Sequence, residues 1–420
     1  MRKILLLKIP LFIVVVASWG MSWGYAQADL NALLTALQTS PEALELRATL
    51  DAAAASLQQE RSMFNVAGSA SYSYLPDDPD ATPVGAGVDL SFDPLILGDD
   101  ADDARTAELE FQQAELVYAR ALAQLQIDTI LDALDITTAE QIVAVREQAA
   151  ELAALQVQAA TAQLERGSGT NSELRDAELE LDSANLALQN AADALTQARS
   201  VLTNRVGEVL GLRVLDVEVP EGDAVALRLA VLERDQTQIT LSRTQRNLYP
   251  TLSAGYTQQL GANAALGASI DSDDLSPNVS FDYNPGDDVT TRVRIGIGAS
   301  FSPADVSATK VAQRNVDAAT FALDAAQRDA ALQRSALERS LAQAEAQEAL
   351  AQRVLTNAQT TLGEVNARVN LGLSTPLATA EAEQALAQAE LELRQARLVR
   401  LSSELAFYPF TATLLTEVQP

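Results

Sequence analysis

Two stretches of the sequence, 99–166 and 304–362, contain neither glycine nor proline and are rich in alanine. A continuous helix over either stretch would be on the order of 90–100 Å long at ~1.5 Å per residue, which is too long for a compact domain. Leucine and valine are sparse among the alanines, and alanine favours both helix formation and short distances between packed helices. The pattern therefore predicts long helices in coiled-coil-like contact, without a thick hydrophobic core.

Each long helix is followed by a turn and a returning helix. Gly167 and Gly372 take the position after a helix that favours glycine. Thr170 and Glu173 have the spacing of a capping box, and Thr375 is an N-cap followed by proline. The returning helices, ~45–55 Å long, would cover only half of their partners. A helix before the first strand of each half is expected to cover the rest.

Four further segments alternate with a period of two between apolar residues and small or polar residues, as a β-strand with two different faces does. The segments are 66–75, 84–92, 250–260 and 289–301. Their lengths suit tilted transmembrane β-strands. Asp89, Arg292 and Arg294 fall on the small-residue faces, which predicts that they line a wet lumen. A soluble sandwich would show the same alternation, so the long helices decide the interpretation.

The order of these elements predicts a tandem duplication after a signal peptide at 1–28. The first repeat, 29–218, is expected to contain a helix 41–62, strands 66–75 and 84–92, a long helix 95–166, a tip turn 167–170 and a return helix 171–206. The second repeat, 219–410, is expected to contain a helix 222–247, strands 250–260 and 289–301, a long helix 303–371, a tip turn 372–375 and a return helix 376–405, before a tail 411–420. The acidic segment 263–288 is expected to be a solvated extracellular loop, and the binding of a divalent cation there stays open.

Four strands cannot close a barrel, and open sheet edges are not tolerated in lipid. Several copies of the chain must therefore contribute strands, and three copies would give twelve. The expected fold class is mainly α with a membrane β-barrel portion. Each protomer would add four strands to a shared β-barrel and carry long antiparallel coiled-coil helices.

Composition excludes several classes of function. The chain has no cysteine and no histidine, so zinc sites of the usual kind, cysteine nucleophiles and histidine bases are absent, and no cofactor or metal is expected. Without Arg2, Lys3 and Lys8 of the signal peptide, 26 basic residues remain against 57 acidic ones, a net charge of −31. Nucleic acid is an unsuitable partner for such a surface, and no carboxylate pair indicates an enzyme.

Taken in order, these segments resemble the TolC-like outer membrane efflux protein family over about 29–410. The resemblance lies in "LNALLTALQTSPEALELRATLDAA", "NLYPTLSAGY", the FDP and FSP joints, "EVLGL" and "NLGLSTPLATAEAEQAL". It implies a homotrimer in the cell outer membrane whose twelve-stranded barrel continues as a helical barrel through the periplasm. It also implies two partners, a periplasmic adaptor protein and an inner-membrane pump.

The resemblance assigns roles by position. The adaptor-docking tips would comprise Gly167, Ser168, Leu371, Gly372, Leu373 and Ser374. Aromatic residues at the membrane interface would be Phe92, Tyr249 and Phe301. The resemblance does not assign a charged gate. From their position near the first tip, Glu165, Glu173 and Asp176 would supply charge at the entrance, and a solvated helix face is the competing interpretation.

The predicted function is a passive exit duct of a tripartite efflux or type I secretion system. The alternative is a structural protein that spans the periplasm as a tether and conducts nothing. The small, polar strand face favours the duct, since only a lumen needs it.

Overall fold

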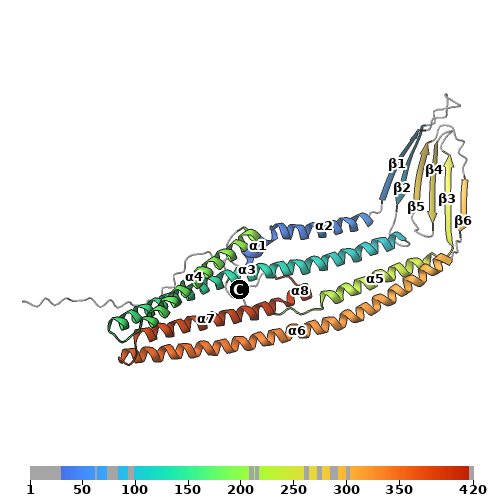
Figure 1. Cartoon of the computed structure of the whole chain (residues 1–420). Helices are drawn as coiled ribbons and strands as arrows, with labels where there is room; N and C mark the ends of the chain where they lie inside the picture. The colour runs from blue at the N-terminus through green and yellow to red at the C-terminus, as the bar shows by residue number, and fades with distance from the viewer. Residues whose placement is uncertain are drawn as a thin grey trace, which may run out of the picture.

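The computed structural model describes residues 30–61, 64–72, 84–92, 99–207, 212, 217–259, 264–271, 277–283, 292–298 and 303–415. The predicted signal peptide, Phe301 and the residues Asp93, Pro94 and Ser302 of the strand-to-helix joints lie outside these ranges. The molecule is elongated, with a β-sheet at one end and the turns of two helical hairpins at the other (Figure 1). The described helices are α1 Leu30–Gln38, α2 Pro41–Glu60, α3 Asp99–Glu165, α4 Asn171–Val206, α5 Val225–Arg246, α6 Pro303–Asn370, α7 Pro376–Leu405 and α8 Phe407–Thr411.

The two long helices, α3 with 67 residues and α6 with 68, are each about 100 Å long at ~1.5 Å per residue. Two shorter helices pack along each of them: α4 and α2 along α3, and α7 and α5 along α6. The expectation that a helix before each first strand covers the second half of the long helix is therefore confirmed.

The helices form a curved wall in which α3 holds the two halves of the chain together. It contacts α5, α7 and α8 as well as its own partners α2 and α4 (Figure 1). Helix α6 lies at the outer edge of the wall, and its buried residues are alanines. The wall is thus thin, because alanine lets helix axes approach closely.

Among the described residues, a thicker hydrophobic core lies at the middle of α3, where both halves meet. The fully buried members include Leu33 of α1, Leu134 of α3, Leu202 of α4 and Leu401 of α7. The Tyr408 hydroxyl of α8 donates a hydrogen bond of 2.9 Å to the backbone carbonyl of Glu218. This core fixes the two helical hairpins to each other at mid-length.

The sheet differs from the prediction of four strands. Six described strands, β1 Phe64–Tyr72, β2 Val84–Phe92, β3 Thr251–Gln259, β4 Ala264–Asp271, β5 Pro277–Tyr283 and β6 Arg292–Gly298, form one antiparallel sheet. Their order is β1-β2-β5-β4-β3-β6. Strands β4 and β5 lie within 263–288, for which the sequence predicts a loop throughout.

The interpretation failed because that segment is rich in residues typical of turns. Aspartate, glycine, asparagine and proline hide an alternation carried by Leu266, Ile270, Val279 and Phe281. Pairing along neighbouring strands outweighs the low intrinsic preference of such residues for β-structure. Among the described helices, none is both long and apolar enough to cross a lipid bilayer.

Candidate functional site

The sheet has one apolar face that continues across the described strands of both repeats. Register pairs Tyr256 of β3 with Val293 of β6, and Leu266 of β4 with Phe281 of β5. All four side chains are exposed to the surroundings of this single chain. A row of large exposed apolar side chains on one face of a sheet indicates contact with a nonpolar medium or another protein surface.

The other face carries small and polar residues. Ser253, Gly255 and Thr257 of β3 alternate with the apolar residues of that strand. These three residues are half-buried, whereas the apolar residues between them are exposed. Of the predicted lumen-lining residues, Arg294 is exposed and pairs in register with Gly255. By backbone register, Arg292 lies opposite Thr257, and Asp89 lies opposite Ala67 and Ser280, on this same face.

The predicted interface aromatics lie near the ends of strands. Phe92 is the last residue of β2 and pairs in register with Phe64. Tyr249 lies two residues before β3 and its side chain is exposed. Phe301 lies outside the described residues.

The two turns at the opposite end of the molecule share one backbone geometry. Gly167 and Gly372 have φ angles of 72° and 69°, in the left-handed region that glycine adopts without strain. Each glycine N–H donates to the carbonyl three residues earlier, at 3.0 and 2.9 Å. The next N–H groups, of Ser168 and Leu373, donate to carbonyls five residues earlier. This is the Schellman motif, which satisfies the last carbonyls of a helix.

The two turns differ in the side chains they present. Leu371 and Leu373 flank Gly372 and are 73% and 75% exposed, whereas Ser168 and Arg166 flank Gly167. Ser374 is half-buried beside them. The second turn therefore presents an exposed apolar surface at the end of the molecule away from the sheet, and the first turn presents a polar one.

The acidic residues predicted at the entrance are all exposed. Glu165 ends α3, and Asp176 lies in the second turn of α4. Glu173 completes the predicted capping box, since its Oε2 accepts from the Thr170 N–H at 2.7 Å and its N–H donates to Thr170 Oγ1 at 3.3 Å. Glu173 thus has a structural role at the start of α4 in addition to its charge.

An arginine–aspartate cluster, which the sequence analysis missed, joins α5 to α3 beside the sheet. Arg243 contacts Asp103 and donates to the backbone carbonyl of Asp99 at 2.9 Å. Arg246 pairs with Asp99 at 3.0 Å and with Asp102. The hydrogen bond with Asp103 raises the pKa of the Arg243 guanidinium. The cluster places cations at the C-terminal end of α5 and anions at the N-terminal end of α3, where the helix dipoles favour them.

A second group of charges surrounds the middle core. Burial raises the pKa of the Asp132 carboxyl, Arg205 opposes the rise, and Asp128 and Glu42 add to it. Arg205 contacts Asp132 and lies 3.8 Å from Glu42. At the meeting of α2, α3 and α4, the positive charge of Arg205 therefore offsets only part of the negative charge of the surrounding carboxylates.

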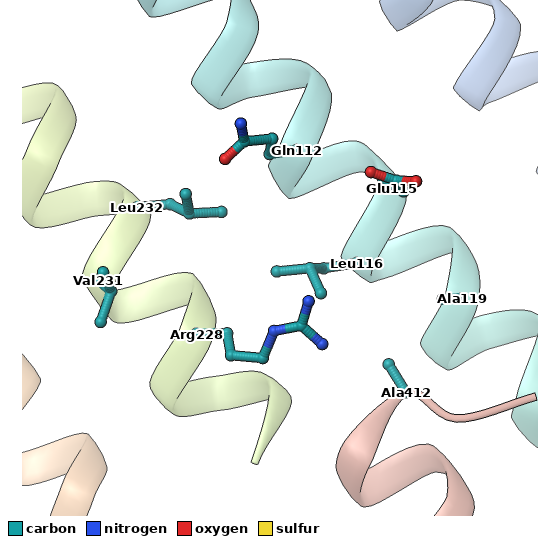
Figure 2. A pocket seen from close by; sticks show the side chains of 8 residues that line it. All are labelled: Gln112, Glu115, Leu116, Ala119, Arg228, Val231, Leu232 and Ala412. Carbon is teal, nitrogen blue, oxygen red and sulfur yellow. The ribbon is translucent and has the colours of Figure 1, made fainter. Parts of the chain in front are cut away.

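A cavity of about 600 Å³ lies between α3 and α5. Arg228 extends from α5 into it, Leu116 faces it from α3, and Ala412 closes one end (Figure 2). The lining mixes apolar and charged side chains, and the described residues bring no catalytic arrangement into it.

The two outer edges of the helical wall expose large apolar side chains. Phe321, Leu332 and Leu350 lie on α6, and Leu179 and Leu186 lie on α4. The last two are seven residues apart, which places them on one face of the helix. Both edges thus resemble surfaces that pack against another helix.

No family model matches the sequence, and no curated protein is similar to it in sequence. Solved structures are similar in fold. The outer membrane protein VceC of Vibrio cholerae matches with a TM-score of 0.64 and 16% identity, over 90% of this chain and 95% of that one. The open-state outer membrane channel MtrE of Neisseria gonorrhoeae matches with a TM-score of 0.66 and 15% identity, over 92% of this chain and 90% of that one. The CmeC outer membrane channel of Campylobacter jejuni matches with a TM-score of 0.61 and 14% identity, over 93% of this chain and 87% of that one. Over about nine-tenths of its length, the chain therefore has the fold of the TolC-like outer-membrane channels.

Proposed function

We propose that the protein is a trimeric channel of the cell outer membrane that extends into the periplasm and serves as the passive exit duct of a tripartite efflux or type I secretion system. The observation that carries the proposal is the two-faced sheet joined to helices about 100 Å long. The exposed apolar face suits lipid, and the small polar face suits a water-filled lumen.

Unsatisfied edges support an assembly of several copies, which we propose to be a trimer. The sheet ends at β1 and β6, whose outer backbone groups need partners in a membrane. The helical wall ends in two different apolar edges, on α4 and on α6. Unlike edges that join head to tail close into a ring when the rotation between copies allows it. Light scattering in detergent should give three times the mass of the mature chain.

The tips would bind the adaptor protein, which in turn links the duct to an inner-membrane pump. Exposed Leu371 and Leu373 support docking at the second tip, beside Gly372 and Ser374. Gly167 and Ser168 form a turn of the same geometry at the first tip, where the contact would be polar. Energy would come from the pump, because the chain itself is proposed to be no enzyme.

The remaining residues take roles along the duct. Asp89, Arg292 and Arg294 would line the lumen, and Phe92, Tyr249 and Phe301 would lie at the membrane interface. Glu165, Glu173 and Asp176 would set the charge at the periplasmic entrance.

Single-channel recording of the purified protein in planar bilayers tests the function. A duct gives discrete conductance steps on insertion, whereas the alternative, a tether that spans the periplasm without conducting, leaves a bilayer with inserted protein sealed. Insertion is verified independently by flotation of the protein with liposomes.

A further inference from the structure

The hairpin of β4 and β5 lies between the strands of the two repeats. Strand β5 pairs with β2 over Ala86–Ser91, and β4 pairs with β3 over Ser253–Gln259. These pairings cover most of the nine residues of each neighbour. Since the hairpin runs alongside β2 and β3, it lies at the same depth as they do and is no cap above them.

The hairpin also continues both faces of the sheet without a break. Ala268 of β4 is exposed and lies in register between Tyr256 of β3 and Val279 of β5, on the apolar face. Gly267 and Ser269, its neighbours in sequence, pair with Thr257 and Gly255 on the small-residue face. A shift of one residue would invert every side chain, so this agreement indicates a register selected for two different surroundings.

The ends of the hairpin strands fit the same interpretation. Pro277 is the first residue of β5, a position where its missing N–H costs no hydrogen bond within the sheet. Strands β4 and β5 have eight and seven described residues, and the flanking strands β2 and β3 have nine each. The hairpin is therefore nearly as tall as the two strands beside it.

We propose that the β4–β5 hairpin lies in the lipid bilayer as part of the channel wall, so that each subunit contributes six strands and three subunits close a barrel of eighteen. The proposal rests on the proposed function, because it assumes a trimeric barrel. For a strand spacing of ~4.8 Å and a tilt of ~40°, the backbone radius rises from about 12 Å with twelve strands to about 18 Å with eighteen.

The wider barrel has two further lumen positions with charge. By register, Asp271 lies opposite Ser253, and Asp282 lies opposite Gly87 and Ala265, all on the small-residue face. Asp271, Asp282 and Asp89 would thus add negative charge to the face that also carries the positive charges of Arg292 and Arg294. The outer opening would then be broad and of mixed charge, and the helical part of the duct would limit which solutes pass.

The experiment uses single cysteines, which the sequence allows without background because it contains none. The test pair is A268C and S269C on β4, which lie on opposite faces, and the reference pair is A254C and S253C on β3. Both pairs replace a small side chain by one of similar size. The purified trimer in liposomes is treated with a charged maleimide, which reacts with thiolates in contact with water.

We expect A268C to react at least ~10-fold more slowly than S269C, because a thiol in lipid ionises poorly. The reference pair must show the same contrast. If A254C and S253C react equally, the sheet is not in lipid and the proposed channel itself fails. If the reference pair shows the contrast while A268C and S269C both react rapidly, the hairpin lies outside the bilayer and the eighteen-stranded barrel is wrong.

Electron cryomicroscopy of the protein in lipid nanodiscs provides an independent measurement. A barrel of eighteen strands with a backbone radius near ~18 Å supports the proposal, and twelve strands at ~12 Å overturn it. This measurement needs no substitution, so a variant that fails to fold cannot obscure the answer.

Discussion

Gly167 and Gly372 reverse the chain at the ends of the two longest helices, and both do so with a positive φ angle. Any other residue at either position would be strained by about 1 kcal/mol or more, because its Cβ would crowd the following carbonyl. Contact with more distant residues is not the constraint, since apart from the adjoining backbone an added Cβ would meet no atom within 4 Å at either glycine. The backbone of the two tips is thus equivalent, and any difference in what they bind must come from the residues beside the glycines.

The two tip leucines should matter for export and not for folding. Replacing both in L371S/L373S removes apolar area that an adaptor would bury, and a loss of about 1.5–3 kcal/mol per leucine corresponds to at least a tenfold weaker contact. We expect export in cells to fall at least tenfold while single-channel conductance stays unchanged. The matched control is L44S, which removes an exposed leucine of α2 away from both tips. Export by L371S/L373S equal to that by L44S would contradict docking at the second tip.

Asp132 should make stability depend on pH. Because burial raises its pKa in the folded protein, the folded state binds the proton more tightly than the unfolded state does. The resulting stability is present at about pH 3 and is lost as the pH rises through the raised pKa. D132N should therefore gain thermal stability relative to the native chain between about pH 3 and pH 7, as measured by the midpoint of the helical circular dichroism signal. A difference that is independent of pH would show that Arg205 compensates Asp132 fully.

At the scale of the elements, the chain is organised by where helices end. Helices α2 and α4 lie one after the other along α3, and α5 and α7 do the same along α6. The ends of the shorter helices fall where α1, α8 and the middle of α3 supply the hydrophobic core. The helices on the tip side of the core are held by the core and by the tip turns. On the sheet side, α5 is held to α3 near the core and by the arginine–aspartate cluster.

The arginine–aspartate cluster should hold α5 to α3. The pairs are partly exposed, so each should contribute about 0.2–1 kcal/mol, and R243Q/R246Q should lower the free energy of unfolding by about 1–2 kcal/mol. Added salt should reduce the difference, since it screens such charges. The control is R234Q, because Arg234 pairs with its neighbour Asp235 on α5, and no ion pair joins it to another of the described elements. An equal loss in R234Q would mean that the cluster has no special role.

Much of this organisation can be predicted from the sequence, and the rest depends on contacts between distant residues. The capping box of Thr170 with Glu173 and the tip glycines involve neighbours, so a local pattern identifies them. The cluster joins Arg243 to Asp99 across 144 residues, and no local pattern reports that distance. The middle core does have a signal, the closely spaced isoleucines and leucines of "IDTILDALDI" in α3, which was interpreted only as part of a helix.

On the scale of the whole molecule, charge and shape act together. Without the predicted signal peptide each chain would carry a net charge of −31, from 26 basic and 57 acidic residues, and the proposed trimer would carry on the order of −90 around one duct. A wall of low dielectric focuses such a potential into the lumen, and salt screens what lies more than ~8 Å away. In the proposed trimer the periplasmic entrance should matter most, because both helical hairpins of each chain end there.

The duct should therefore prefer cations, less strongly as the salt concentration rises. The measurement is the reversal potential across a KCl gradient in a planar bilayer, at low and at high mean concentration. E173Q and D176N should each weaken the preference, although Glu173 also caps α4, so the exposed Asp176 gives the cleaner result. An anion preference at low salt would show that Arg166, Arg175, Arg292 and Arg294 set the charge of the inner surface.

The two unlike apolar edges of the helical wall have a genetic consequence. If copies join by setting the α6 edge of one against the α4 edge of the next, every subunit takes part in two contacts. A substitution such as F321D would disrupt the α6 contact of each defective subunit that enters a ring. When intact and defective chains are equally abundant and assemble at random, only about one-eighth of trimers contain no defective subunit. Alleles altered at these edges should therefore be dominant over the intact gene, whereas alleles that prevent a chain from folding should be recessive.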